Sequence, residues 1–314
     1  MTMPATASAA GLREWMMAVR PQTLPAGAAP VVVGIGVAYY ESVFATGPAL
    51  AALIGALLIQ IGTNFANDYY DAQRGVDGPD REGFTRVTQA GIIPEETVKR
   101  AMILTFGCAF GIGTFLVYIG GIPIVIIGIA SVLCGIAYAG GPAPFGSYGL
   151  GDVFVFVFFG VVAVTGTYYV QAVTVVADSF PLWIPAGSIA SSAVIASLAM
   201  AGLTTAILVV NNIRDIETDR AAGKYTLAVL IGRRYSVVEF VLLLGLAYSI
   251  PVYLLLLEGA WILGLPLLTI PYGVLLCRDV ITGPGGSALN QTLESTGRLL
   301  AIFAILFTIG FLLA

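Results

Sequence analysis

Long apolar stretches recur along the whole chain and are separated by short polar connections. A helix needs roughly 17–25 apolar residues to cross a bilayer. We expect about nine membrane-spanning helices, over residues 23–40, 47–66, 101–119, 121–138, 153–176, 186–210, 235–257, 260–277 and 297–314. The longest polar stretch, 67–100, is too short for a separate soluble domain. The pattern therefore predicts an all-α integral membrane protein in which residues 1–314 form one polytopic domain.

The composition agrees with this fold class. Hydrophobic residues make up 58% of the 314 residues and charged residues only 10%, whereas a soluble domain has about 25% charged residues. Residues 1–10 are small and mostly polar and do not resemble a cleavable signal peptide. We expect residues 1–12 to form a flexible tail. The expected environment is a lipid bilayer, and we expect no nucleic-acid partner.

The positions of lysine and arginine predict the orientation in the membrane, because these residues are enriched in cytoplasmic connections. The connections near Glu41, Ile119, Asp178 and Glu258 contain none of them. We therefore expect a multi-pass protein of the cell membrane with a cytoplasmic N-terminus and a C-terminus on the far side. All fourteen fall before the first span or in the alternate connections, as Arg13, Arg20, Arg74, Arg81, Arg86, Lys99, Arg100, Arg214, Arg220, Lys224, Arg233, Arg234, Arg278 and Arg298.

Two acidic motifs of similar form end the second and sixth predicted spans. In each motif an asparagine is followed four residues later by an aspartate, so both side chains fall on one helical face. Both helices run inward in the predicted topology, which places both motifs at the cytoplasmic boundary. The candidate ligands are Asn67, Asp71 and Asp77 in the first motif, and Asn211, Asp215 and Asp219 in the second.

Carboxylates at a helix C-terminus need a positive partner, because the helix dipole disfavours each of them by about 0.3–1 kcal/mol. The chain contains no histidine, and its three cysteines lie in apolar runs, so a metal here would be a hard ion held by oxygen. Magnesium accepts carboxylate oxygens and is often completed by phosphate oxygens of a substrate. We also expect Lys224 and Arg86 to contact phosphate, although topology alone accounts for cations at this boundary.

The two motifs resemble those of the UbiA superfamily of membrane prenyltransferases. The resemblance covers most of the chain and narrows to the 1,4-dihydroxy-2-naphthoate polyprenyltransferases of menaquinone synthesis. One departure is Phe84-Thr85, where a proline-containing stretch is expected before Arg86. The matching segments are Arg20-Pro21-Gln22-Thr23-Leu24-Pro25, Asn67-Asp68-Tyr69-Tyr70-Asp71, Asn211-Asn212-Ile213-Arg214-Asp215, Gly223-Lys224-Tyr225-Thr226-Leu227, Tyr138-Ala139-Gly140-Gly141-Pro142 and Gly149-Leu150-Gly151-Asp152.

The resemblance implies a nine-helix bundle with a cytoplasm-facing active-site cavity. It also implies two magnesium ions, one held by Asp71 and Asp77 and one by Asp215 and Asp219, with the asparagines assisting. The implied substrates are a polyprenyl diphosphate and 1,4-dihydroxy-2-naphthoate, and the implied products are demethylmenaquinol, carbon dioxide and diphosphate. Further implied contacts are Tyr69, Tyr138, Tyr148 or Tyr168 with the allylic cation, and Arg20 or Arg86 with the acceptor carboxylate.

Other readings remain open from the sequence. Within the superfamily the acceptor could be 4-hydroxybenzoate, a phylloquinone precursor that takes a phytyl group, or a glycerol-phosphate lipid. A secondary transporter also places carboxylates in a membrane, but it does so near the bilayer midplane. The predicted position of the motifs at the membrane boundary favours the transferase.

Overall fold

The computed structural model describes residues 11–74, 87–139 and 148–314. All of the named elements in this part of the chain are helical. They are α1 (Leu12–Val19), η1 (Pro21–Thr23), α2 (Leu24–Tyr40), α3 (Thr46–Arg74), α4 (Glu95–Ala139), α5 (Gly151–Phe154), η3 (Val155–Val162), α6 (Ala163–Val176), α7 (Ser191–Arg214), α8 (Ile216–Ala221), α9 (Leu227–Glu258), η4 (Trp261–Thr269), α10 (Ile270–Thr282), η5 (Gly286–Leu289) and α11 (Asn290–Leu313).

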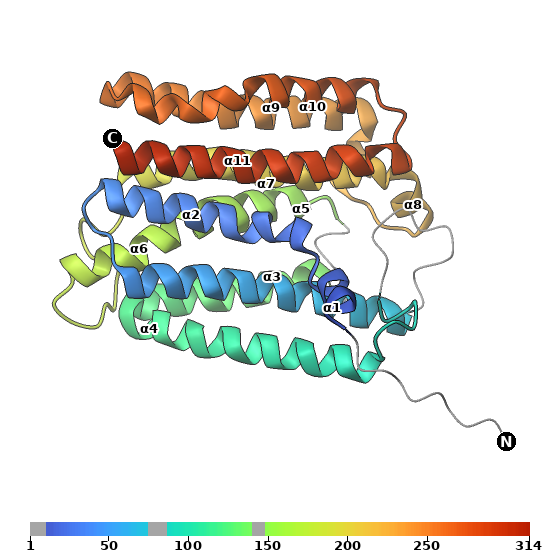
Figure 1. Ribbon diagram of the computed structural model, residues 1–314, viewed down its shortest axis with the longest axis horizontal. Helices are drawn as coiled ribbons and strands as arrows, with labels where there is room; N and C mark the ends of the chain where they lie inside the picture. Colours follow the sequence, from blue (N-terminus) through green and yellow to red (C-terminus); the bar gives the residue numbers. More distant parts are fainter. Residues whose placement is uncertain (1–10, 75–86, 140–147) are drawn as a thin grey trace.

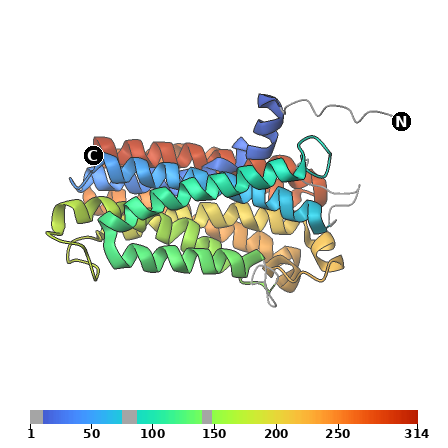
Figure 2. The ribbon, with the colours of Figure 1, turned by 90° about the horizontal axis from the view of Figure 1, so that it is seen from below.

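The long helices form one bundle with their axes roughly parallel (Figure 1). Eight stretches of the described chain are long and apolar enough to cross a membrane. One of them belongs to α4, which is broken at Gly121 by a positive φ of 66°. The two halves of α4 run side by side in opposite directions (Figure 2). Counting these halves separately gives the nine spans expected from the hydrophobic pattern.

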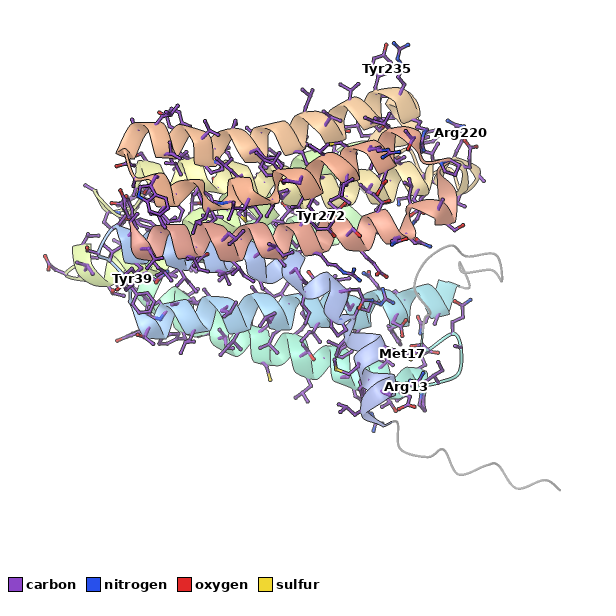
Figure 3. The ribbon with its side chains drawn as sticks, turned by 45° about the horizontal axis from the view of Figure 1, so that its top comes forward. Arg13, Met17, Tyr39, Arg220, Tyr235 and Tyr272 are labelled. Atoms are coloured by element: carbon purple, nitrogen blue, oxygen red, sulfur yellow. The ribbon has the colours of Figure 1, made fainter. Side chains whose placement is uncertain are left out.

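The bundle has two chemically different ends. We call the end where α3 and α7 finish the motif end, and the other the opposite end; α8 and the start of α11 also lie at the motif end (Figure 1). Figure 3 shows Arg13 and Arg220 toward the motif end and Tyr39 toward the opposite end. Each described helix that carries lysine or arginine carries it toward its motif end. For the described residues, the expected segregation of charge is confirmed.

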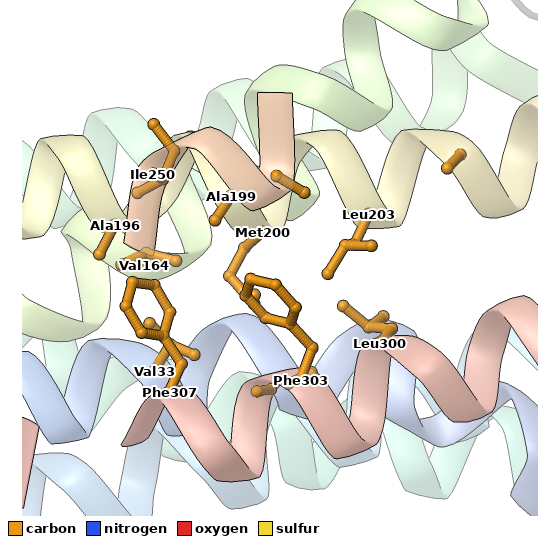
Figure 4. Packing of buried hydrophobic residues seen from close by; sticks show 14 of the residues in the cluster. Val33, Val164, Ala196, Ala199, Met200, Leu203, Ile250, Leu300, Phe303 and Phe307 are labelled. Carbon is orange, nitrogen blue, oxygen red and sulfur yellow. The ribbon is translucent and has the colours of Figure 1, made fainter. Parts of the chain in front are cut away.

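Helix α7 is the centre of the bundle. In an apolar 18-residue stretch of α7, 72% of the residues are buried, compared with 11% in the corresponding stretch of α4. It packs against α2, η3, α6, α9 and α11. Its many alanine, serine and threonine residues allow this close approach, because small side chains let helix backbones come together. Figure 4 shows Met200 and Leu203 of α7 facing Leu300 and Phe303 of α11 across the core.

A short helix that the hydrophobic pattern does not predict precedes the first span. Helix α1 begins at Leu12 and lies across the bundle axis at the motif end (Figure 2). It is tied to α3 by an edge-to-face contact between Trp15 and Phe65, whose ring centroids are 5.8 Å apart. Residues 1–10 of the expected tail lie outside the described part of the chain.

The tightest helix contact generates a first prediction. A Cβ atom added at Gly160 in η3 would overlap the backbone and Cβ of Ala201 in α7. Gly160→Ala should therefore push η3 away from the central helix and lower the free energy of unfolding by about 1–3 kcal/mol. Thermal unfolding of the purified protein in detergent measures the change.

The matched control is Gly166→Ala, because a Cβ at Gly166 on the next helix meets no atom within 4 Å. This control should unfold at or slightly above the wild-type temperature, since alanine favours a helix. Equal losses in the two variants would contradict the packing explanation.

Candidate active site

The second motif lies where the central helix leaves the membrane-spanning part of the bundle. Helix α7 ends at Arg214, and Asp215 is both its C-terminal cap and the residue before α8, with φ −95° and ψ 8°. The single helical face expected for the motif is therefore interrupted at Asp215. The backbone N–H of Asp219 still donates to the Asp215 carbonyl at 2.8 Å. This bond keeps the two aspartates adjacent across the interruption.

Asp215 is held in a charged hydrogen-bond network. Arg214 Nε and Nη2 donate to the two carboxylate oxygens of Asp215, each at 2.7 Å. Arg214 Nη2 also donates to Asn211 Oδ1 at 2.9 Å, and Nη1 donates to Asn290 Oδ1 of α11 at 3.1 Å. Asn211 Nδ2 donates to Asp215 Oδ2 at 3.3 Å. Two-pronged arginine–carboxylate pairs fix both charge and orientation, so Asp215 is positioned before any ligand binds.

Asp219 has its own cationic partner. Lys224 Nζ lies 3.3 Å from Asp219 Oδ1, and the Lys224 backbone N–H donates to the Asp219 carbonyl at 2.8 Å. Gly223, with φ +70°, makes the turn that returns Lys224 to the aspartate. Burial raises the pKa of the Asp219 carboxyl above its ordinary value, nearby Lys224 opposes this rise, and Asp215 adds to it. Asp219 is thus a carboxylate whose charge needs a cation.

The first motif lies on the last turns of α3, at the same end of the bundle as the second (Figure 1). Asn67 is exposed, as a residue that meets a ligand requires. The backbone of Asp71 lies in α3, and that of Tyr138 lies in the last turn of α4, but both side chains are outside the described part of the chain. Asp77 and Arg86 also lie outside it.

A neighbouring aspartate that the motif analysis does not single out has several buried contacts. Asp68 is fully buried, and its Oδ1 atom lies 3.3 Å from Arg20 Nη2. The backbone N–H and the hydroxyl of Thr88 donate to Asp68 Oδ2 at 3.1 and 3.0 Å. Asp68 therefore joins the start of the first span to the segment after the first motif. The candidate Arg20 is 7% exposed. We call Arg20, Asp68 and Thr88 together the Asp68 corner.

The described residues of the two motifs do not by themselves form a complete metal site. Among them, no group of three or more acidic, histidine or cysteine side chains is placed to hold a metal ion. Asp215, Asp219 and Asn211 supply oxygen ligands of the type that magnesium prefers. A complete site at this end thus requires ligands from a further segment, and the first motif on α3 lies at the same end.

Comparison with known proteins identifies a family and a similar enzyme. Residues 28–291 match the model of the UbiA prenyltransferase family. The chain is 40% identical over 234 residues to 1,4-dihydroxy-2-naphthoate octaprenyltransferase of Escherichia coli strain K12, and the match covers 70% of each protein.

Solved structures with the same fold are more distant in sequence. A UbiA homologue from Aeropyrum pernix K1 has a TM-score of 0.69 and 12% identity, over 92% of this chain and 97% of that one. A UbiA homologue from Archaeoglobus fulgidus, solved with DMAPP and Mg²⁺, has a TM-score of 0.60 and 15% identity, over 96% and 99% of the chains. The helical bundle is therefore an established membrane fold.

The buried Asp68 corner generates a second prediction. Asp68→Ala would leave Arg20 and Thr88 without the carboxylate to which they bond, and should cost about 3–5 kcal/mol in the free energy of unfolding. The exposed pair of Glu96 with Arg100, whose side chains are 61% and 78% exposed, gives the control. Glu96→Ala should change stability by at most about 0.5 kcal/mol. Denaturation in detergent compares the stabilities of the two variants. Equal losses in both would contradict a stabilising role for the Asp68 contacts.

The pKa of Asp219 generates a third prediction. A carboxyl must lose its proton before it binds a divalent cation, so magnesium affinity should fall as the pH drops through the Asp219 pKa. Lys224→Met removes the cation that opposes the raised pKa. The midpoint of magnesium binding, titrated against pH without substrate, should therefore move to higher pH.

Arg220→Met is the control for this experiment, because Arg220 is exposed and pairs with Glu217 instead. Its midpoint should stay within experimental error of the wild-type value. A Lys224→Met midpoint that is unchanged, or that moves to lower pH, would contradict the assigned electrostatics.

Proposed function

The chain belongs to the UbiA prenyltransferase family, and from this we propose that it transfers a polyprenyl group to 1,4-dihydroxy-2-naphthoate. The donor is a polyprenyl diphosphate, and the products are demethylmenaquinol, carbon dioxide and diphosphate, as in menaquinone synthesis. The main support is the cluster of Asp215, Asp219 and Lys224 at the end of the central helix. The similarity to the Escherichia coli octaprenyltransferase supports this acceptor over the other aromatic acceptors.

Magnesium fits the donor set of this site, since the candidate ligands are carboxylates and amides and the chain has no histidine. We propose that Asp71 and Asp77, with Asn67, hold one ion and that Asp215 and Asp219, with Asn211, hold a second. When bound, magnesium would neutralise charge on the departing diphosphate. The Archaeoglobus fulgidus homologue was solved with Mg²⁺ and a prenyl diphosphate, which supports this assignment.

The cationic side chains at this end have separate proposed roles. Lys224 and Arg86 donate hydrogen bonds to diphosphate oxygens, which stabilises the charge that develops as the carbon–oxygen bond breaks. Tyr138 presents its ring to the allylic cation that results. Arg20 binds the carboxylate of the acceptor and does so from its buried position beside Asp68.

The prenyl chain needs an apolar path that is separate from the diphosphate site. An apolar groove of about 310 Å³ lies between α2 and α11. It begins beside Arg20 and continues along membrane-spanning segments, so a prenyl chain in it would remain in the hydrocarbon region. We propose that this groove holds part of the prenyl chain of the donor. It is lined by Pro21, Leu24, Pro25, Ala28, Ala29, Val32, Ala301, Ala304 and Ile305.

The orientation follows from the charge distribution. The motif end carries the lysines and arginines of the described helices, and such residues are enriched on the cytoplasmic side. We therefore place the active site and the N-terminus on the cytoplasmic side of the cell membrane and the C-terminus on the far side. A secondary transporter is disfavoured because its binding site would lie near the bilayer midplane.

This function generates a fourth prediction. Asp71→Ala, Asp215→Ala and Asp219→Ala should each lower prenyl transfer by about 1,000-fold, equivalent to about 4 kcal/mol of transition-state stabilisation. Glu217→Ala, an exposed residue in the same short helix as Asp219, should retain wild-type activity. Magnesium-dependent release of diphosphate by the purified protein, given a prenyl diphosphate and the acceptor, measures turnover.

The same assay separates the two function classes. A transporter would release no diphosphate in the presence of magnesium and both substrates. Substantial activity in the Asp215→Ala variant would contradict the assigned role of the second motif.

A further inference from the structure

The turn between α1 and α2 contains a strained residue at a candidate binding position. Arg20 has a left-handed backbone conformation, with φ 54° and ψ 70°. This conformation is unfavourable for a residue that carries a Cβ atom, and Pro21, which follows, disfavours a right-handed helical backbone at Arg20. A strained conformation persists where the surrounding structure holds it. The contacts around the turn therefore decide how Arg20 is presented.

Helix α3 supplies these contacts from one face. Gln60, Asn64 and Asp68 are spaced four residues apart, which places them on the same side of the helix. Asn64 is the central member and is 4% exposed. Its side-chain amide donates to the Val19 carbonyl at 2.7 Å and to the Thr23 hydroxyl at 2.9 Å. Asn64 thus bridges the two ends of the turn.

Thr23 connects Asn64 to Arg20. The hydroxyl of Thr23 donates to the Arg20 carbonyl at 2.9 Å, and its backbone N–H donates to the same oxygen, also at 2.9 Å. Gln60 adds a longer bond of 3.4 Å to the Thr23 hydroxyl. The Arg20 backbone N–H donates to the Met16 carbonyl at 3.1 Å and closes α1. The N–H and the carbonyl of Arg20 are therefore both held.

The side chain of Arg20 meets the same face of α3. Its Nη2 atom lies 3.3 Å from Asp68 Oδ1, about one helical turn from Asn64. The direction in which a side chain leaves the backbone depends on φ and ψ, so the conformation that Asn64 holds places the guanidinium beside Asp68. The next residue, Pro21, lines the groove proposed for the prenyl chain. The guanidinium is thus fixed at the start of that groove.

We propose that Asn64 is a positioning residue for Arg20 and thereby sets the affinity of the protein for the carboxylate of the acceptor. This inference rests on the proposed function, in which Arg20 binds that carboxylate. Asn64 acts through Thr23 and the backbone of Arg20, without touching the acceptor. A guanidinium recognises a carboxylate by directional hydrogen bonds. Displacing it should therefore weaken binding of the charged group and leave binding of the neutral ring unchanged.

Asn64→Ala and Thr23→Val each break the connection and test the proposal. Each variant should raise the KM for the acceptor about tenfold, as expected for one weakened hydrogen bond to a charged group. The kcat should stay within about twofold, because the lost contact is the same in the bound state and in the transition state. A thermal shift on binding a prenyl diphosphate with magnesium shows that each variant folds. If Asn64→Ala does not fold, Thr23→Val is compared with its conservative partner.

Two matched controls accompany these variants. Thr23→Ser keeps the hydroxyl that joins Asn64 to Arg20 and should restore the wild-type KM. Thr63→Ala lies beside Asn64 on α3, but Thr63 is exposed and donates to the Ile59 carbonyl of its own helix. Its kinetic constants should equal those of the wild type.

Two ligands that differ by one charge distinguish positioning from a general structural role. 1-Hydroxy-2-naphthoate and its neutral amide, 1-hydroxy-2-naphthamide, are used as competitors of the acceptor. The ratio of their inhibition constants measures the contribution of the carboxylate charge. This ratio should favour the acid in the wild type and in both controls. In Asn64→Ala and Thr23→Val the preference should fall about tenfold, with the amide unaffected.

The proposal is overturned if the test variants weaken the acid and the amide equally, or if they leave both unchanged. A loss of kcat with an unchanged acceptor KM would also overturn it. Equal inhibition of the wild type by the acid and the amide would show that no cation recognises the carboxylate, which overturns it as well. Failure of the wild type to prenylate 1,4-dihydroxy-2-naphthoate would instead refute the proposed function.

Discussion

Acidic side chains at the C-terminal ends of two membrane helices are the constraint on which this structure depends. A helix C-terminus already carries partial negative charge, so Asp215, which follows the last residue of α7, lies where a carboxylate is unfavourable. Asp219 lies one turn further on, in the short helix α8, and is largely buried. Arg214 and Lys224 offset this charge in the folded chain. They also orient both carboxylates toward one end of the bundle. The two aspartates and their cationic partners thus lie together at the motif end.

Helix α7, whose apolar stretch has the largest buried share among the described spans, leads directly to the second motif. Helix α7 packs against seven other helical elements, namely α2, η3, α5, α6, α9, η5 and α11, and ends at the second motif. Its small residues permit close packing, and Asn290 of α11 fixes the arginine that holds Asp215. The first motif depends on a separate corner, in which Asp68 joins Arg20 to Thr88. The ends of α3 and α7, which carry the two motifs, are thus each held by a separate buried network at the same end of the bundle.

The spans and the segregation of charge were predictable because hydrophobicity and topology act over many residues. Even the break at Gly121 appears in the sequence as two adjacent apolar stretches. Helix α1 was not predicted, because its eight residues are too few and too mixed to stand out. The role of Asp68 was missed because its partners, Arg20 and Thr88, are distant in sequence. The contact of Arg214 with Asn290 of α11 was missed for the same reason.

The central claim is that both motifs bind one diphosphate between them. It is tested most directly by a structure of the protein with Mn²⁺ and a prenyl thiodiphosphate that does not ionise, in which anomalous scattering locates the metal. The account predicts metal within coordinating distance of Asp71 and of Asp215, on either side of a single diphosphate. Metal and diphosphate held by one motif alone, or located away from both, would contradict it.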